Sequence, residues 1–81
     1  MKKLFKKHLL AIRKRGKITD QTTNFDFFAK AIEELSEFSN EYDPQEAIDL
    51  MCVMANYLQS RGYNIKQLLK RNIEHQQTRK D

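Results

Sequence analysis

The residues best able to do chemistry form an acidic run in the middle of the chain. Residues 33–49, EELSEFSNEYDPQEAID, hold seven carboxylates in seventeen positions, although the net charge of the whole chain is +4. Carboxylates that are brought together repel one another, and a hard divalent cation removes that repulsion. Mg²⁺ and Mn²⁺ both suit ligand sets made of oxygen atoms. The run therefore has two interpretations, a divalent metal site or a solvated helix surface.

The spacing of the acids follows the helical repeat on two consecutive segments. At 100° per residue, Glu34 and Glu37 lie on one edge of the first segment, beside its apolar face. Glu46 and Asp49 share one edge of the second segment. A tight hairpin between the two helices would make these four carboxylates converge, and they are the expected metal ligands.

Ordinary structural roles explain the same acids equally well. Glu46 is the third residue after Asp43, so it can complete a capping box and interact favourably with the helix dipole. Lys30 precedes Glu34 by one helical turn and can pair with it on the helix surface. Spacing alone leaves both interpretations open.

Four helices are expected to position these residues, and we find no alternating strand pattern. The first helix ends at Gly16 and is followed by a linker over residues 17–24. Thr23 and Asp26 resemble a capping box, which predicts a second helix to about Asn40.

Two further start signals predict the third and fourth helices. Asp43 followed by Pro44 is an N-cap with proline at the first helical position, and the helix that follows should run to about Ser60. Gly62 is placed to end it, and Asn64 is placed to cap the last helix.

Short connections between these helices predict an all-α fold, an up-and-down antiparallel helical bundle. A chain of 81 residues buries a modest core, so we expect oligomerisation to complete the bundle. The apolar residues expected to point inward on the second, third and fourth helices are Phe28, Ile32, Leu35 and Phe38; Leu50, Met51, Met54, Ala55, Tyr57 and Leu58; and Ile65, Leu68, Leu69 and Ile73.

One side of the third helix is polar but carries no charge. Between Leu50 and Ser60 this side presents Cys52, Asn56 and Gln59, where a freely exposed face would more often carry Lys or Glu. We therefore expect another helix or a second subunit to cover it.

Charge is distributed unevenly along the chain. Residues 1–17 sum to +8 and the remaining residues to −4. The sequence suggests a basic N-terminal helix or arm (1–16), a linker (17–24) and a helical domain (25–81). The arm either packs as an amphipathic helix through Leu4, Phe5, His8, Leu9, Ala11 and Ile12, or binds nucleic acid or another anionic partner.

The cellular setting follows from what the sequence lacks. Cys52 is the single cysteine and cannot form an internal disulfide, and no apolar run is long enough for a signal or membrane segment. A cytoplasmic protein without membrane association is expected.

Residues 25–79 resemble the MazG-like all-α nucleoside triphosphate pyrophosphohydrolases. Glu33-Glu34-Leu35-Ser36-Glu37 matches their EExxE element, and Glu46-Ala47-Ile48-Asp49 matches their ExxD element. The lysine before EExxE, the Ala55-Asn56 pair and the closing SRGYNIKQLLKRN are also similar. Eight residues separate Glu37 from Glu46, fewer than is usual in that family.

The resemblance implies a fold and an activity. It implies a dimer or tetramer that hydrolyses a (deoxy)nucleoside triphosphate to a monophosphate and pyrophosphate with Mg²⁺, or Mn²⁺. By position, Glu34, Glu37, Glu46 and Asp49 would be metal ligands, and Glu33 would orient or deprotonate the water. The substrate-binding residues implied are Lys30, Asn56, Arg71 and Arg79. The alternative is a non-catalytic helical protein that binds nucleic acid or a partner through its basic arm.

Overall fold

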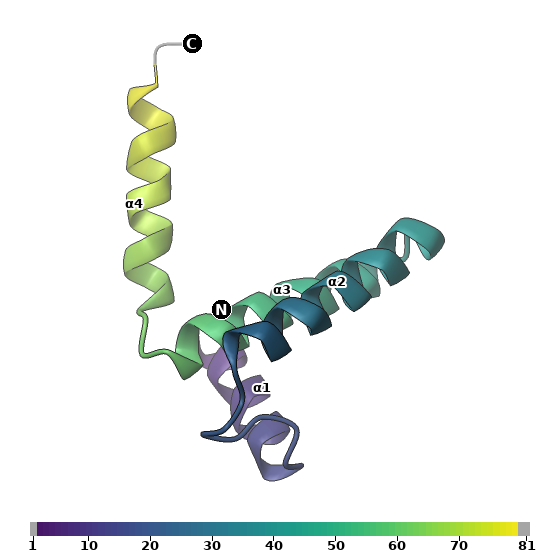
Figure 1. Cartoon of the computed structure of the whole chain (residues 1–81). Coiled ribbons are helices and arrows are strands. Elements are labelled where there is room, and N and C mark those ends of the chain that lie inside the picture. The colour runs from purple at the N-terminus through teal and green to yellow at the C-terminus, as the bar shows by residue number, and fades with distance from the viewer. Residues whose placement is uncertain (1, 80–81) are drawn as a thin grey trace.

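The computed structural model describes the backbone of residues 2–79 and the side chains of residues 3–79 (Figure 1). Its elements are α1 (Lys2–Lys14), α2 (Asn24–Glu41), α3 (Pro44–Ser60) and α4 (Ile65–Thr78), and no strand occurs in this range. The expected all-α fold with four helices is therefore confirmed for the described residues. None of these helices is both long enough and apolar enough to span a membrane.

The caps expected for α2 and α3 are present. Thr23 accepts from the Asp26 N–H at 3.1 Å, and Asp26 accepts from the Thr23 N–H at 2.8 Å, which completes a capping box. Asp43 accepts from the Gln45 N–H at 2.9 Å at the start of α3. Between the two helices the chain reverses through Tyr42 at φ 54°, so α2 and α3 form an antiparallel hairpin.

Glycine ends both α1 and α3 in the same way. Gly16 has φ 73° and donates to the Arg13 carbonyl at 3.0 Å, while Lys17 donates to the Ile12 carbonyl at 3.2 Å. Gly62, at φ 79°, repeats this arrangement after α3. Such left-handed termination suits glycine because it has no Cβ, and these two positions confirm the predicted helix ends.

The buried core joins α1, the connection that follows it, and α2. Leu9, Ile18 and Phe27 form this core, with Ile12 and Tyr57 packed against it. The Phe27 and Tyr57 rings meet edge to face, with centroids 5.6 Å apart. Helix α1 and the segment 15–23 are therefore packed parts of the same body as the hairpin.

Helix α2 buries a different face from the one we predicted. Phe28 is 62% exposed, and Ile32 and Leu35 are exposed as well, whereas Phe27 and Glu34 point inward. Phe38, the fourth residue of the predicted face, is half-buried. The prediction was wrong for the other three because apolar residues occupy more than half the circumference of this helix. Periodicity then allows two inward faces, and the packing of Phe27 with Leu9 and Ile18 selects one.

The uncharged side of α3 is covered by α1, which confirms the prediction that another element lies on it. Asn56 is only 4% exposed, and the Gln59 side chain donates to the Phe5 carbonyl at 3.1 Å. On the expected apolar side Ala55 is buried, but Met51 and Met54 are exposed.

Helix α4 projects away from the hairpin in Figure 1 and has no buried residue. Its predicted inward face is half-buried at Ile65 and Leu68 and exposed at Leu69 and Ile73. On α1 the predicted inward face also holds in part, since Leu4 and Ala11 are exposed. Helices α1, α2 and α3 therefore form a helical bundle, and α4 is not packed into it.

Candidate functional site

The α2–α3 hairpin brings the acidic residues of its two helices together. Glu34, Glu46 and Asp49 each place one carboxylate oxygen within 4.8 Å of the others. Glu33, Glu34 and Glu37 form a second such group, which shares Glu34 with the first. The eight-residue separation between Glu37 and Glu46 therefore permits the two acidic edges to meet.

Two oxygens of this acidic cluster are buried without a hydrogen-bond donor. Glu34 is 7% exposed; its Oε1 lies 3.2 Å from the Lys30 Nζ, but its Oε2 has no partner among the described residues. Glu46 Oε2 is also buried and has no hydrogen-bond partner among the described residues. A buried carboxylate oxygen without a donor is costly, and a proton or a cation relieves that cost.

The electrostatics of Glu46 and Lys30 reflect this crowding. Removal from water raises the pKa of the Glu46 carboxyl. Glu37 raises it further through its charge and through a hydrogen bond between the two carboxyls, and the charges of Asp49 and Glu41 add to this. The pKa of Lys30 is raised mainly by its hydrogen bond to Glu34, with a smaller contribution from Glu33. The site thus holds more negative charge than its one lysine offsets.

Glu33 lies on the solvent side of the acidic cluster. Its side chain is exposed and its Oε1 is 3.4 Å from the Lys30 Nζ. This position is open to water, and the role of Glu33 in handling a water proton stays a prediction.

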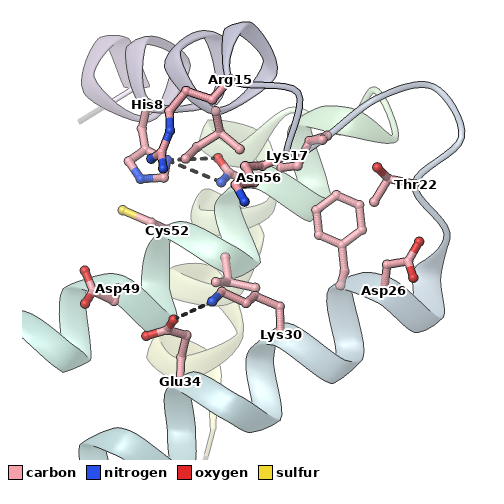
Figure 2. Close-up of a pocket in the computed structure, with 14 residues that line it drawn as sticks. His8, Arg15, Lys17, Thr22, Asp26, Lys30, Glu34, Asp49, Cys52 and Asn56 are labelled. Atoms are coloured by element: carbon pink, nitrogen blue, oxygen red, sulfur yellow. Dashed lines mark hydrogen bonds and ion pairs between the residues drawn. The ribbon is translucent and has the colours of Figure 1, made fainter.

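A cleft of about 580 Å³ adjoins the acidic cluster (Figure 2). Lys30, Glu34 and Asp49 line one part of it, and Asn56 lines the part nearer α1. Four of the residues predicted from the sequence to bind metal or substrate therefore face one space.

Asn56 connects this cleft to the N-terminal helix. The Asn56 Nδ2 lies 3.3 Å from the Nδ1 of His8, within hydrogen-bonding distance, and His8 also lines the cleft. Because Asn56 is buried, this contact fixes α1 against α3 next to the space that a ligand would occupy.

Two predicted phosphate-binding residues lie elsewhere. Arg71 belongs to α4 and Arg79 follows it; both are exposed, and neither lines the cleft. Because α4 projects away from the hairpin, the chain does not bring these arginines to the acidic cluster. Their role in binding substrate stays a prediction.

Arg15 and Lys17 line the cleft instead, and the sequence analysis did not assign them to the site. A signal for them was present, because they flank Gly16, where the basic helix must end and the chain must turn. The sequence did not show that this turn lies over the hairpin.

Cys52 also lines the cleft but is poorly suited to nucleophilic chemistry. Burial raises the pKa of its thiol, and the negative charge of Asp49 raises it further. Since the thiolate is the reactive form, this environment favours an unreactive thiol.

Comparison with known proteins adds no relative: no family model matches the chain, and no curated protein or solved structure is significantly similar to it. The resemblance to the MazG-like family stays a prediction that rests on the acidic motifs.

Proposed function

We propose that this protein is a divalent-metal-dependent nucleotide pyrophosphohydrolase, which converts a nucleoside triphosphate to a monophosphate and pyrophosphate. The observation that carries the proposal is the pair of buried, partnerless oxygens on Glu34 and Glu46, within an acidic cluster beside a cleft that also holds cationic side chains. Acids and cations that face one space suit a ligand made of a metal ion and phosphate groups.

The donor set fits Mg²⁺ or Mn²⁺, because it consists entirely of carboxylate oxygens. Glu34, Glu37, Glu46 and Asp49 would hold the ion. When bound, it would supply charge neutralisation for the triphosphate and a water molecule with a lowered pKa. Without it, the partnerless oxygens of Glu34 and Glu46 retain the cost of burial.

Side chains of this chain would share the remaining tasks. Lys30 fixes Glu34 through its ion pair and lies at the edge of the cleft, where its Nζ can meet a phosphate oxygen. Glu33 would take the proton of the water that attacks phosphorus, while the bridging oxygen leaves with pyrophosphate. The cleft volume lies within the range of about 300–1,000 Å³ typical of small-molecule sites. Asn56 would contact the sugar or the base.

A homo-oligomer, dimer or tetramer, belongs to the same proposal. Phe25, Phe28, Ile32 and Leu35 form an exposed apolar stripe along α2, and Met51 and Met54 are exposed on α3. Contiguous apolar surface of this kind is typical of protein interfaces, and the buried core of the described chain is small. A second copy of the chain would cover the stripe, which predicts that Phe28→Glu lowers the mass measured by analytical ultracentrifugation.

The alternative function, binding of nucleic acid through the basic arm, has one observation in its favour. Lys3, Lys6, Lys7 and Lys14 are exposed on α1, which places positive charge at the surface of that helix. This alternative requires neither the acidic cluster nor the cleft.

One experiment separates the two functions. The full-length protein is incubated with canonical and modified nucleoside triphosphates plus Mg²⁺ or Mn²⁺, and pyrophosphate release is measured for wild type, Glu37→Gln and the matched control Glu74→Gln. We expect release that Glu37→Gln abolishes and that Glu74→Gln, on α4, retains.

Two results together would contradict the hydrolase proposal. They are no release from any nucleotide and no change in melting temperature on addition of the metal ion. Salt-sensitive binding of a DNA duplex that is lost when the α1 lysines are replaced by glutamine would then favour the alternative.

A further inference from the structure

The turn after α1 presents two cationic side chains to the cleft. Arg15 precedes Gly16 and Lys17 follows it, and both line the cleft (Figure 2). The turn is held by the Gly16 and Lys17 N–H groups, which donate to carbonyls of the last turn of α1. The position of both side chains is therefore tied to the position of helix α1.

Helix α1 is itself held on the hairpin at several points. His8 contacts the buried Asn56, the Phe5 carbonyl accepts from Gln59, and Leu9 lies in the core. These contacts join α1 to α3. The turn that carries Arg15 is followed directly by Ile18, which is buried in the core with Leu9 and Phe27. The backbone of this turn is therefore fixed on the packed part of the cleft wall, and the exposed side chains of Arg15 and Lys17 extend from it.

These two cations differ from the other cations nearby in lacking a protein partner. Arg13 pairs with Asp20 at 3.5 Å, Arg61 donates to Asn24 and Thr22, and Lys30 pairs with Glu33 and Glu34. Within residues 3–79, neither Arg15 nor Lys17 has a side-chain hydrogen bond or ion pair. Their charge is available to a ligand.

The acids of the cleft do not take up this charge. Glu34 is engaged by Lys30, and Asp26 accepts the hydrogen bond that caps α2. Asp49 belongs to the acidic cluster, and Asn56 lies seven positions further along α3, a rise of about 10 Å at 1.5 Å per residue. The cleft therefore has an acidic end and, toward α1, a cationic wall.

We propose that Arg15 and Lys17 bind the phosphate oxygens of the ligand, so that helix α1 forms one wall of the active cleft and is not a separate nucleic-acid-binding arm. Arginine binds phosphate oxygens through paired N–H groups, and lysine supplies a point charge. That the phosphates belong to a nucleoside triphosphate rests on the proposed function. The anion site itself rests only on the cleft and its two cations.

The test measures binding of inorganic pyrophosphate to the full-length protein by calorimetry, with EDTA present to remove divalent ions. The variant is Arg15→Gln/Lys17→Gln. The matched control is Lys7→Gln/Lys14→Gln, which removes the same charge from α1 at exposed residues that do not line the cleft. Thermal melting of both variants checks that they are folded.

We expect the Arg15→Gln/Lys17→Gln variant to bind pyrophosphate at least about tenfold more weakly, because each substitution removes a charge-assisted contact to a phosphate oxygen. The Lys7→Gln/Lys14→Gln control should change affinity less than about threefold, as expected for distant screened charges. Arg15→Lys with Lys17→Arg should restore most of the affinity, because both positive charges are retained.

If both double variants bind pyrophosphate equally weakly, the proposal is overturned, because that result would show that pyrophosphate is attracted by the overall positive charge of this part of the chain. Absence of pyrophosphate binding by the wild type would overturn it as well. The proposed function is judged separately, by pyrophosphate release. A wild type that binds pyrophosphate through Arg15 and Lys17 but hydrolyses no nucleotide would contradict the hydrolase and leave the anion site standing.

Discussion

Helices α1 and α4 are alike in sequence and opposite in structure. Both are terminal, amphipathic and rich in Lys and Arg, and they have 13 and 14 residues. Helix α1 packs on α3 and buries Leu9, whereas α4 has no fully buried residue and projects from the hairpin. An apolar face on a helix therefore indicates that the helix can pack against a partner, but it does not identify that partner.

The connections explain much of the difference. Nine residues join α1 to α2, and Ile18 among them is buried between the helices, so the connection is itself part of the core. Four residues join α3 to α4, and Tyr63 among them is exposed. The connection after α1 is thus anchored in the core by Ile18, whereas all four residues of the connection after α3 are exposed and none lies in the core.

The largest expected effect compares a leucine on each of these helices. Leu9→Ala should lower the free energy of unfolding by about 3 kcal/mol, because the lost side chain is buried and a cavity remains. Leu69→Ala should lower it by less than about 1 kcal/mol, because Leu69 is 51% exposed. Urea unfolding at low protein concentration measures both values.

Equal losses of unfolding free energy from Leu9→Ala and Leu69→Ala would contradict the contrast between a packed α1 and an unpacked α4. That result would mean that α4 has a partner in solution, and a loss for Leu69→Ala that grows with protein concentration would identify the partner as a second copy of the chain. Leu10→Ala on the exposed side of α1 is the control, with little change expected.

Local signals in the sequence were the most successful predictors. Thr23 with Asp26, Asp43 with Pro44, and Gly62 all mark helix ends where the structure has them, because caps depend on residues within one turn. Angles on a helix also predicted much of the acidic cluster, since Glu34, Glu46 and Asp49 converge and Glu37 groups with Glu34.

Signals that depend on a partner were less successful. The inward face predicted for α2 is exposed at Phe28, because two apolar faces competed and α1 decided between them. The resemblance to the MazG-like family implied Arg71 as a phosphate-binding residue and did not imply Arg15. Which basic segment lines the cleft depends on how the chain folds back, and local pattern does not encode that.

The next effect in size compares the two glycines that end α1 and α3. Gly16→Ala and Gly62→Ala should each cost about 1–2 kcal/mol of stability, because both have positive φ while an added Cβ would meet no atom within 4 Å. Only Gly16→Ala should also weaken pyrophosphate binding, since it lies between Arg15 and Lys17. Chemical denaturation and calorimetry provide the two measurements.

A result in which Gly62→Ala weakens binding as much as Gly16→Ala would show that the orientation of α4 also affects the cleft. In that case Arg71 and Arg79 would regain support as phosphate-binding residues, reached through a movement of α4 or through a second subunit.

A smaller effect is expected for the arginines at the ends of α1 and α3. Arg61 donates to Asn24 and to the Thr22 carbonyl and lies over the Phe27 and Tyr57 rings, so Arg61→Ala should cost about 1 kcal/mol. Arg13→Ala should cost less than about 0.5 kcal/mol, because its partner Asp20 is almost fully exposed. Melting in high salt should reduce the Arg13 effect and preserve most of the Arg61 effect.

The smallest effect concerns pH and separates a glutamate in the acidic cluster from one on α4. The pKa of Glu46 is raised in the folded protein, so without metal the folded state loses stability as the pH rises above the ordinary carboxyl pKa of 4.5 and through the raised pKa of the folded state. Glu46→Gln should therefore melt above wild type at pH 7, and the two should converge below about pH 4.5. Glu74→Gln is the matched control, because it removes a carboxylate on exposed α4, outside the acidic cluster.

Mg²⁺ should raise the melting temperature of the wild type more than that of Glu46→Gln if the acidic cluster holds the ion, because binding to the folded state alone is stabilising. An equal Mg²⁺ response in the two proteins would remove Glu46 from the ligand set, while a Glu46→Gln variant that melts below wild type at pH 7 would show that its carboxylate stabilises the hairpin.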